Sequence, residues 1–110
     1  MERLVKGDVI VIDFPFSNLV QVKRRPVLII KIPKGDDIIV NQITGKSYES
    51  SVEIPVIKKD FIRGGLKVDS YLRLDKIFSI EKSLIKYKIG SLKSEKFNGI
   101  LNKIISFLKD

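Results

Sequence analysis

Short apolar runs separated by turn residues make up the chain as far as about residue 90. Most of them are rich in β-branched side chains and too short for helices, which is typical of strands. Pro15 ends the first run, because proline cannot donate a hydrogen bond to a strand ladder. The pattern predicts strands at residues 9–14, 26–32, 38–43, 51–57, 66–74, 77–80 and 85–89. The connections between them are expected as a loop at residues 17–24, a tight turn at 34–36 and a turn-like stretch ending at Gly64-Gly65.

The predicted strand at residues 66–74 alternates between apolar and polar positions, as does the strand at 51–57. Side chains in a strand point to opposite faces with a period of two. The apolar face of 66–74 is formed by Val68, Leu72 and Leu74. The opposite face carries Tyr71, Arg73 and Asp75. We therefore expect the first face to lie in the core and the second to be accessible.

The end of the chain follows a helical period. Its apolar residues, spaced three and one apart, are Phe97, Ile100, Leu101, Ile104, Ile105 and Leu108. Such a stripe is typical of a helix that packs on a core. Ser94 is the expected N-cap, and Glu95 lies near the positive end of the helix dipole.

Six or seven short strands followed by one helix predict a mainly β protein, a small, partly open barrel that the helix caps. A chain of 110 residues without a visible linker or repeat is expected to form a single domain, residues 1–110. The N-terminus lacks the apolar segment of a signal peptide, and no apolar run is long enough to span a membrane. We therefore expect a cytoplasmic protein.

Composition restricts the chemistry. The chain contains neither cysteine nor histidine, which excludes thiolate nucleophiles, disulfides, zinc sites of the usual type and imidazole catalysis. The formal net charge is +8, which favours polyanions such as nucleic acid. The basic residues are clustered: residues 23–34 hold five of them and no acidic residue. A lysine-rich composition without any nucleic-acid role is the alternative explanation of the charge.

Three local features offer candidate chemistry. In Lys23-Arg24-Arg25-Pro26 the proline favours an extended Arg25, whose guanidinium matches phosphate oxygens. At the end of the third strand, Thr44-Gly45 places a hydroxyl beside a residue that permits close backbone approach. Arg73 and Asp75 share a strand face, where the carboxylate stays ionised beside the cation. Each has a structural alternative: a solvated basic corner, an ordinary strand end and a surface ion pair.

Taken together, these segments resemble the MazF/PemK toxin family. The resemblance is carried by residues 6–16, by residues 23–30 with their Arg-Pro pair, by 65–80 with Asp69-Ser70, and by Lys88-Ile89-Gly90 before the terminal helix. Each pair is weakly specific, but their order and joint spacing cover nearly the whole chain.

The resemblance implies an SH3-like, partly open barrel of the MazF/CcdB/Kid type that acts as a homodimer. It also implies an endoribonuclease toxin that cleaves single-stranded RNA and is held by a cognate acidic antitoxin. The family's catalytic residues fall on Arg25 and Thr44, and in some members on Arg73 and Asp75. The expected RNA contacts are Lys23, Arg24, Ser70 and Lys76.

The expected reaction is transphosphorylation without a metal or other cofactor. The 2′-hydroxyl attacks the adjacent phosphorus and leaves a 2′,3′-cyclic phosphate and a 5′-hydroxyl. Two departures from the family pattern stand out: the histidine that some relatives carry in the first loop is absent, and residues 19–22 of that loop are apolar. Two alternative functions remain, a gyrase inhibitor like CcdB and a nucleic-acid-binding barrel without catalysis.

Overall fold

The structure, a computed structural model, describes residues 3–15 and 22–110. Its strands are β1 (Asp8–Pro15), β2 (Val22–Lys31), β3 (Asp37–Thr44), β4 (Glu53–Val56), β5 (Phe61–Gly64), β6 (Ser70–Glu81) and β7 (Ile85–Leu92). Two 3₁₀ turns, η1 (Lys58–Asp60) and η2 (Lys82–Leu84), precede β5 and β7. One helix, α1 (Ser94–Lys109), follows the last strand. The mainly β class with a C-terminal helix is therefore confirmed.

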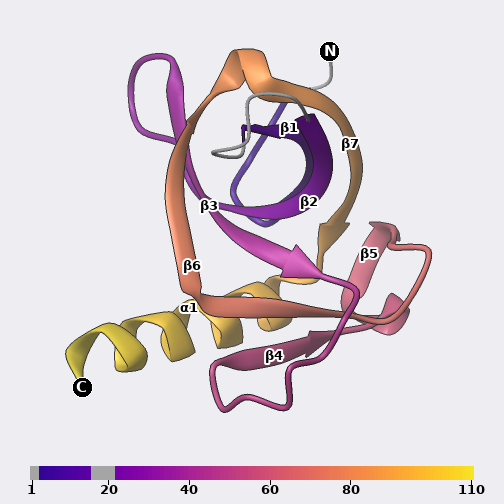
Figure 1. The fold of residues 1–110 in the computed structure, drawn as a ribbon, viewed down its shortest axis with the longest axis vertical. Helices are drawn as coiled ribbons and strands as arrows, with labels where there is room; N and C mark the ends of the chain where they lie inside the picture. Colours follow the sequence, from indigo (N-terminus) through magenta and orange to yellow (C-terminus); the bar gives the residue numbers. More distant parts are fainter. Residues whose placement is uncertain (1–2, 16–21) are drawn as a thin grey trace.

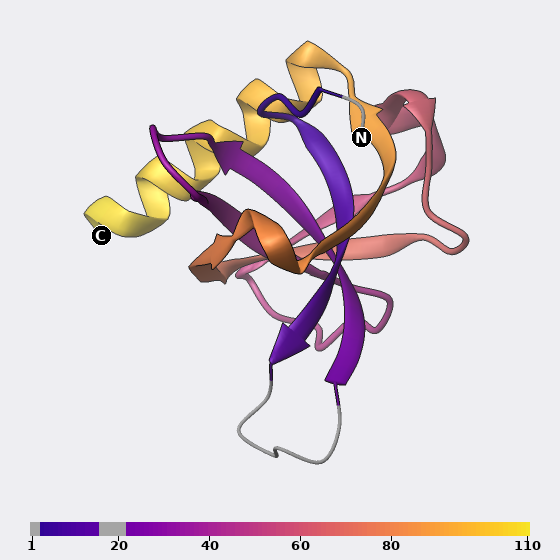
Figure 2. The same ribbon diagram turned by 90° about the horizontal axis from the view of Figure 1, so that it is seen from above.

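The strands form one antiparallel sheet in the order β4-β6-β3-β2-β1-β7-β5. Figure 1 shows the sheet curled into a ring of strands, with α1 running along the outside next to β6. The two end strands of the order, β4 and β5, lie on the same side of the molecule as the helix. Figure 2 shows β1 and β2 side by side, extending away from α1. The sheet is therefore a partly open barrel rather than a flat layer.

Alternation along the strands divides the buried side chains between two cores. One core lies on the inner face of the curled sheet and is formed by Ile10, Ile12, Val27, Ile29, Ile38, Val40, Ile80 and Ile85. The other lies on the opposite face and includes Val9, Leu28, Ile43, Leu72 and the helix residues Phe97, Ile100 and Ile104. Neighbouring residues such as Val27 and Leu28 thus serve different cores. The middle of β2 is buried on both faces, which explains the apolar run Val27-Leu28-Ile29.

Two glycines allow β5 to pair with β7. Gly64 has a φ of 70°, a conformation that favours glycine, and it pairs with Gly90. A Cβ atom at Gly90 would lie 2.7 Å from the carbonyl oxygen of Arg63 and 2.8 Å from the Phe61 ring. The close approach of the two backbones therefore requires glycine at both positions.

The buried Asp8 ties the start of β1 to β7. Its carboxylate accepts hydrogen bonds from the Val5 N–H and the Ser91 hydroxyl, each at 2.8 Å, and Lys88 Nζ lies 3.2 Å away. Asp8 has no exposed surface, so these partners replace the water that the carboxylate loses on folding. The Gly-Asp pair at residues 7–8 therefore has a structural role at the base of the barrel.

The structure corrects several predicted boundaries in the first half of the chain. β2 begins at Val22 rather than Pro26, because Lys23 and Arg24 pair with Phe14 and Asp13 of β1. The predicted loop at 17–24 is therefore wrong at its C-terminal end, and its residues 17–21 lie outside the described residues. The turn-like stretch before Gly65 contains a strand that the pattern missed, β5, whose burial pattern has one buried residue, Phe61.

Further corrections concern the second half. The predicted strands at 66–74 and 77–80 are one strand, β6, which begins at Ser70. Val68 is 62% exposed and precedes the strand, so it does not share the buried face of Leu72 and Leu74. The predicted N-cap at Ser94 is wrong, because α1 begins at Ser94 and its N-cap is Lys93, which makes no side-chain capping bond. No helix in the described part of the chain combines the length and the apolar character needed to cross a membrane.

Candidate functional site

The two adjacent arginines of β2 lie on opposite faces of the sheet. Arg25 pairs with Ile12 and is two residues from Val27, so its side chain lies on the face of the inner core. It is half-buried. Arg24 pairs with Asp13 and has a side chain 61% exposed, with its Nε 3.6 Å from the Asp13 carboxylate. The alternation of side chains along β2 therefore places Arg25 on the inner face of the sheet and Arg24 on the outer face.

Thr44 occupies the last position of β3, as the sequence predicts. The β2–β3 pairing reaches Val27 and Gln42, and the same register extended by two residues would place Arg25 and Thr44 in one row and on one face. Thr44 is 8% exposed, and its Oγ1 accepts the Lys46 N–H at 3.3 Å. A hydroxyl that accepts in this bond keeps its own proton for donation to a second group.

The strands β2 and β3 continue with different partners beyond this row. β2 remains paired with β1 as far as Val22, whereas β3 remains paired with β6 through Thr44 and Tyr71. Figure 1 shows the end of β3 leaving the ring toward β6 and β4. The row that contains Arg25 and Thr44 therefore lies where the two halves of the sheet part.

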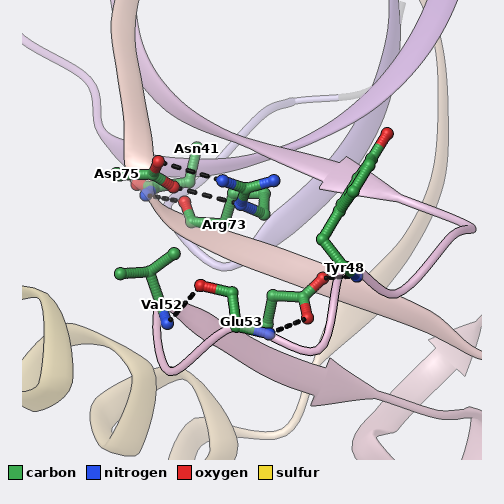
Figure 3. Close-up of polar contacts among 7 residues, drawn as sticks. Asn41, Tyr48, Val52, Glu53, Arg73 and Asp75 are labelled. Atoms are coloured by element: carbon green, nitrogen blue, oxygen red, sulfur yellow. Dashed lines mark hydrogen bonds and ion pairs between the residues drawn. The ribbon is translucent and has the colours of Figure 1, made fainter.

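Arg73 of β6 lies on the same face as Thr44, because Tyr71, its neighbour two residues away, pairs with Thr44. Its Nε and Nη2 donate to the two carboxylate oxygens of Asp75 at 3.1 and 3.0 Å (Figure 3). The Arg73 side chain is 16% exposed and that of Asp75 is 32% exposed. The shared strand face that the sequence predicts is thus occupied by a bidentate ion pair.

The backbone at Arg73 is held by Asn41 of β3. The β3–β6 register shifts between Asn41 and Ile43, because β6 carries extra residues opposite this point. The side-chain amide of the fully buried Asn41 donates to the Arg73 carbonyl at 3.0 Å (Figure 3). This hydrogen bond satisfies a carbonyl in the irregular part of the ladder and fixes the position from which the Arg73 side chain departs.

The ion pair sets the protonation of Asp75. Partial burial by itself raises the pKa of Asp75, but the hydrogen bonds from Arg73 and the nearby charges of Arg73 and Lys76 outweigh it. The pKa of Asp75 is therefore lowered from 3.8, and the carboxylate is ionised at neutral pH.

A hydrogen-bonded loop joins β3 to β4 beside this pair. Glu53 accepts the N–H groups of Tyr48 at 2.9 Å and Ser50 at 3.1 Å, and the Ser47 hydroxyl at 3.1 Å. These hydrogen bonds lower the pKa of Glu53 from 4.5, and the bond from the Tyr48 N–H has the largest effect. Figure 3 shows Glu53 under the loop and the Tyr48 ring above it. One carboxylate therefore organises the whole turn.

The sequence did not single out Tyr48 or Glu53. The ring of Tyr48 lies 5.3 Å from the Arg73 guanidinium carbon and 5.8 Å from Lys46 Nζ, within the range of cation–π contacts. The available signal was one aromatic residue in an otherwise polar loop at residues 45–51. Its significance depends on Arg73, which is far away in the sequence.

The opposite face of the sheet carries a hollow of about 410 Å³, here called the outer hollow. Its lining is mostly apolar, and Arg24 and Ser70 contribute to it. The residues that line it are Val11, Arg24, Pro26, Gly45, Gly65, Leu66, Lys67, Val68, Ser70, Tyr87 and Ile89. Ser70 is 4% exposed, and its hydroxyl donates to the Val68 carbonyl at 2.9 Å.

The eight predicted site residues thus divide into groups. Arg25, Thr44 and Arg73 share one face at the parting of the sheet, with Asp75 joined to Arg73. Arg24 and Ser70 line the outer hollow instead. Two exposed lysines complete the set: Lys23 belongs to β2, and Lys76 lies close enough to Asp75 to affect its pKa.

The first group suits an anion with several oxygens. Two guanidinium groups and an alcohol project from three strands on one face, and both arginine side chains are only partly exposed to water. Charge-assisted hydrogen bonds to phosphate are stronger in such a setting than on an open surface. Within residues 3–15 and 22–110, no group of three acidic side chains is arranged to hold a metal ion.

Comparison with known proteins gives a family match and close structural similarity. Residues 5–108 match the profile of the family described as PemK-like, MazF-like toxin of type II toxin-antitoxin system. No curated protein sequence matches the chain.

Three solved structures share the fold over almost the whole chain. An endoribonuclease in complex with its cognate antitoxin from a mycobacterial species has a TM-score of 0.76 at 15% identity, covering 97% of this chain and 96% of that one. The toxin MazF-mt6 of Mycobacterium tuberculosis has a TM-score of 0.68 at 22% sequence identity, and the match covers 89% of this chain and 91% of that one. The MazE-MazF structure of Deinococcus radiodurans has a TM-score of 0.75 at 14% sequence identity, and the match covers 98% of both chains. The expected architecture of a MazF-type barrel is thereby confirmed.

Substitution of Glu53 tests the organisation of the loop. A lowered folded-state pKa stabilises the fold above pH 4.5, and this contribution is lost as the pH falls through the lowered value. Glu53→Gln should therefore lower the melting temperature at neutral pH, and the difference from the wild type should shrink below pH 4.5. Thermal unfolding followed by circular dichroism between pH 3 and 7 measures this. A pH-independent difference would show that the charge of Glu53 is irrelevant.

Proposed function

Because the chain belongs to the family of PemK-like, MazF-like toxins of type II toxin–antitoxin systems, we propose that it is an endoribonuclease that cleaves single-stranded RNA. The observation that carries the proposal is that Arg25 and Thr44 project from one face of the sheet, each two residues beyond the last β2–β3 pair, Val27 and Gln42. The net charge of +8 supports an RNA substrate. A solved structure with the same fold is described as an endoribonuclease, which supports the same activity.

The reaction we propose is transphosphorylation. The 2′-oxygen of one ribose forms a bond to the adjacent phosphorus while the bond from phosphorus to the 5′-oxygen breaks. The products are a 2′,3′-cyclic phosphate and a 5′-hydroxyl, so no water or metal-bound nucleophile enters the bond-forming step. The nucleophile belongs to the substrate and is already close to the reacting atom, which removes most of the entropic cost.

Arg25 and Thr44 stabilise the charge that develops on the phosphorus oxygens. The Arg25 fork donates to the two non-bridging oxygens, and the Thr44 hydroxyl donates to one of the same two oxygens. Asp75 takes the proton of the 2′-hydroxyl, and the departing 5′-oxygen takes up a proton from solvent. In this scheme Arg73 turns from Asp75 to the phosphate as RNA binds, and the basicity of Asp75 rises at the same time.

The proposed partners are a second copy of the chain and an acidic antitoxin. The solved relatives in complex with an antitoxin support the second of these. The outer hollow supports the first: Val68 and Tyr87 in its lining are 62% and 49% exposed, and Leu66 and Ile89 lie with them. Apolar side chains gathered on one surface are typical of protein interfaces.

The requirement for a 2′-hydroxyl gives the first test. Purified protein in EDTA should cleave single-stranded RNA and leave the DNA of the same sequence intact, because DNA lacks the nucleophile. Gel analysis of the fragments, with detection of the cyclic phosphate, measures both points. A strict need for magnesium, or equal cleavage of DNA, would contradict the chemistry. Binding of RNA without any cleavage would favour a non-catalytic barrel.

The adjacent arginines provide a matched pair of variants. Arg25→Ala should lower the cleavage rate by about 10²-fold or more, because it removes a charged donor from the transition state. Arg24→Ala removes the same charge from the other face of β2 and should change the rate only a few-fold. Single-turnover kinetics at saturating protein compare the two. Equal losses would mean that general charge, rather than the position of Arg25, matters.

Assembly can be tested at the outer hollow. Val68→Asp places a charge among its apolar residues and should convert a dimer into monomers, as measured by sedimentation equilibrium. Ile105→Asp places the same charge on α1, where the side chain is 44% exposed, and should leave the dimer intact. The reverse result would locate the interface on the helix.

A further inference from the structure

The Tyr48 ring is exposed but not loosely attached. The residue is 58% exposed, in a turn between β3 and β4. Its N–H donates to Glu53 at 2.9 Å, and the next N–H, of Glu49, donates to the Ser47 hydroxyl at 3.1 Å. Glu49 has a φ of 51°, so the chain bends sharply directly after the tyrosine. The backbone therefore fixes the position from which the ring projects into solvent.

Such an arrangement lowers the cost of binding. A segment that becomes ordered only when a ligand binds loses conformational entropy, which weakens binding, whereas a segment that is already ordered loses little. Glu53 accepts three hydrogen bonds from the turn, from Ser47, Tyr48 and Ser50, so a single carboxylate keeps the turn closed. The turn that these hydrogen bonds hold carries an aromatic residue that belongs to neither core.

The surroundings of the ring identify the ligand. Arg73 and Lys46 place positive charges 5.3 and 5.8 Å from the ring centroid. The Lys46 N–H also donates to Thr44 Oγ1, so the turn starts at the alcohol of the proposed catalytic row. An aromatic face beside cations that track a phosphate backbone is the usual arrangement for single-stranded nucleic acid.

We propose that Tyr48 is a stacking platform for one nucleobase of single-stranded RNA, beside the phosphate held by Arg25 and Thr44. Lys46 contacts a neighbouring phosphate, and Glu53 is a positioning residue that holds the platform in place. The proposal deepens the proposed function and rests on it. Stacking on a ring face is tolerant of base identity, so Tyr48 sets the position of the strand more than its sequence.

Variants of Tyr48 test the stacking directly. The probe is a single-stranded oligonucleotide with 2′-O-methyl riboses, which keeps its bases and phosphates but has no nucleophile. Tyr48→Ala should weaken its binding about 5- to 150-fold, the usual effect of losing one stacked base. Tyr48→Phe keeps the ring and should bind within about twofold of the wild type, whereas Tyr48→Leu should resemble the alanine variant. Fluorescence anisotropy at fixed salt concentration measures each dissociation constant.

A double-mutant cycle tests the role of Glu53. Glu53→Gln should weaken binding in the wild-type background but cause little further loss in the Tyr48→Ala background, because there is no longer a ring to position. Full additivity of the two losses would overturn the positioning role. Circular dichroism and sedimentation confirm that each variant remains folded and unchanged in assembly.

The outcomes separate this proposal from the nuclease assignment. If the wild-type protein cleaves RNA, and all three Tyr48 variants bind and cleave it equally well, the stacking proposal alone is overturned. Wild-type protein that neither binds nor cleaves single-stranded RNA would overturn both.

Discussion

The antiparallel register between β2 and β3 is the constraint on which both the cores and the candidate site depend. Pairing Val27 with Gln42 places Val27 in the inner core and its neighbour Leu28 in the outer one. The same register puts Arg25 and Thr44, two residues beyond this pair, on a common face. A slip of one residue would move every side chain of the strand to the other face and expose two cores at once. The free energy of burial therefore holds the polar row in place.

The site lies where this pairing ends. β2 continues with β1 and β3 continues with β6, so Arg25 and Thr44 stand on strands that no longer pair with each other. Arg73 reaches the same face from β6 because the ladder there is irregular and Asn41 satisfies the freed carbonyl. The irregularity in the ladder thus accompanies a second guanidinium on the face that carries Arg25.

Carboxylates organise the cations of this region in different ways. Asp75 holds Arg73 through both of its oxygens, which keeps the guanidinium aligned and the carboxylate ionised. Glu53 instead binds backbone groups of a turn and orients Tyr48 beside the same arginine. Asp8, fully buried, has only a structural role at the base of the barrel. The contrast shows that exposure and partners, rather than residue type, determine what each acid does.

The sequence by itself determined the strand-rich class, the C-terminal helix and the pairing of Arg73 with Asp75, because these depend on local periodicity. It also located Thr44 at a strand end. It did not determine that β2 extends to Val22, that β6 is continuous or that β5 exists, because these strands are stabilised by pairing with other strands rather than by their own apolar pattern. Only the tertiary structure separated Arg24 from Arg25 and brought Tyr48 to Arg73. The physical reason is that alternation fixes faces within a strand, whereas register and curvature decide which faces meet.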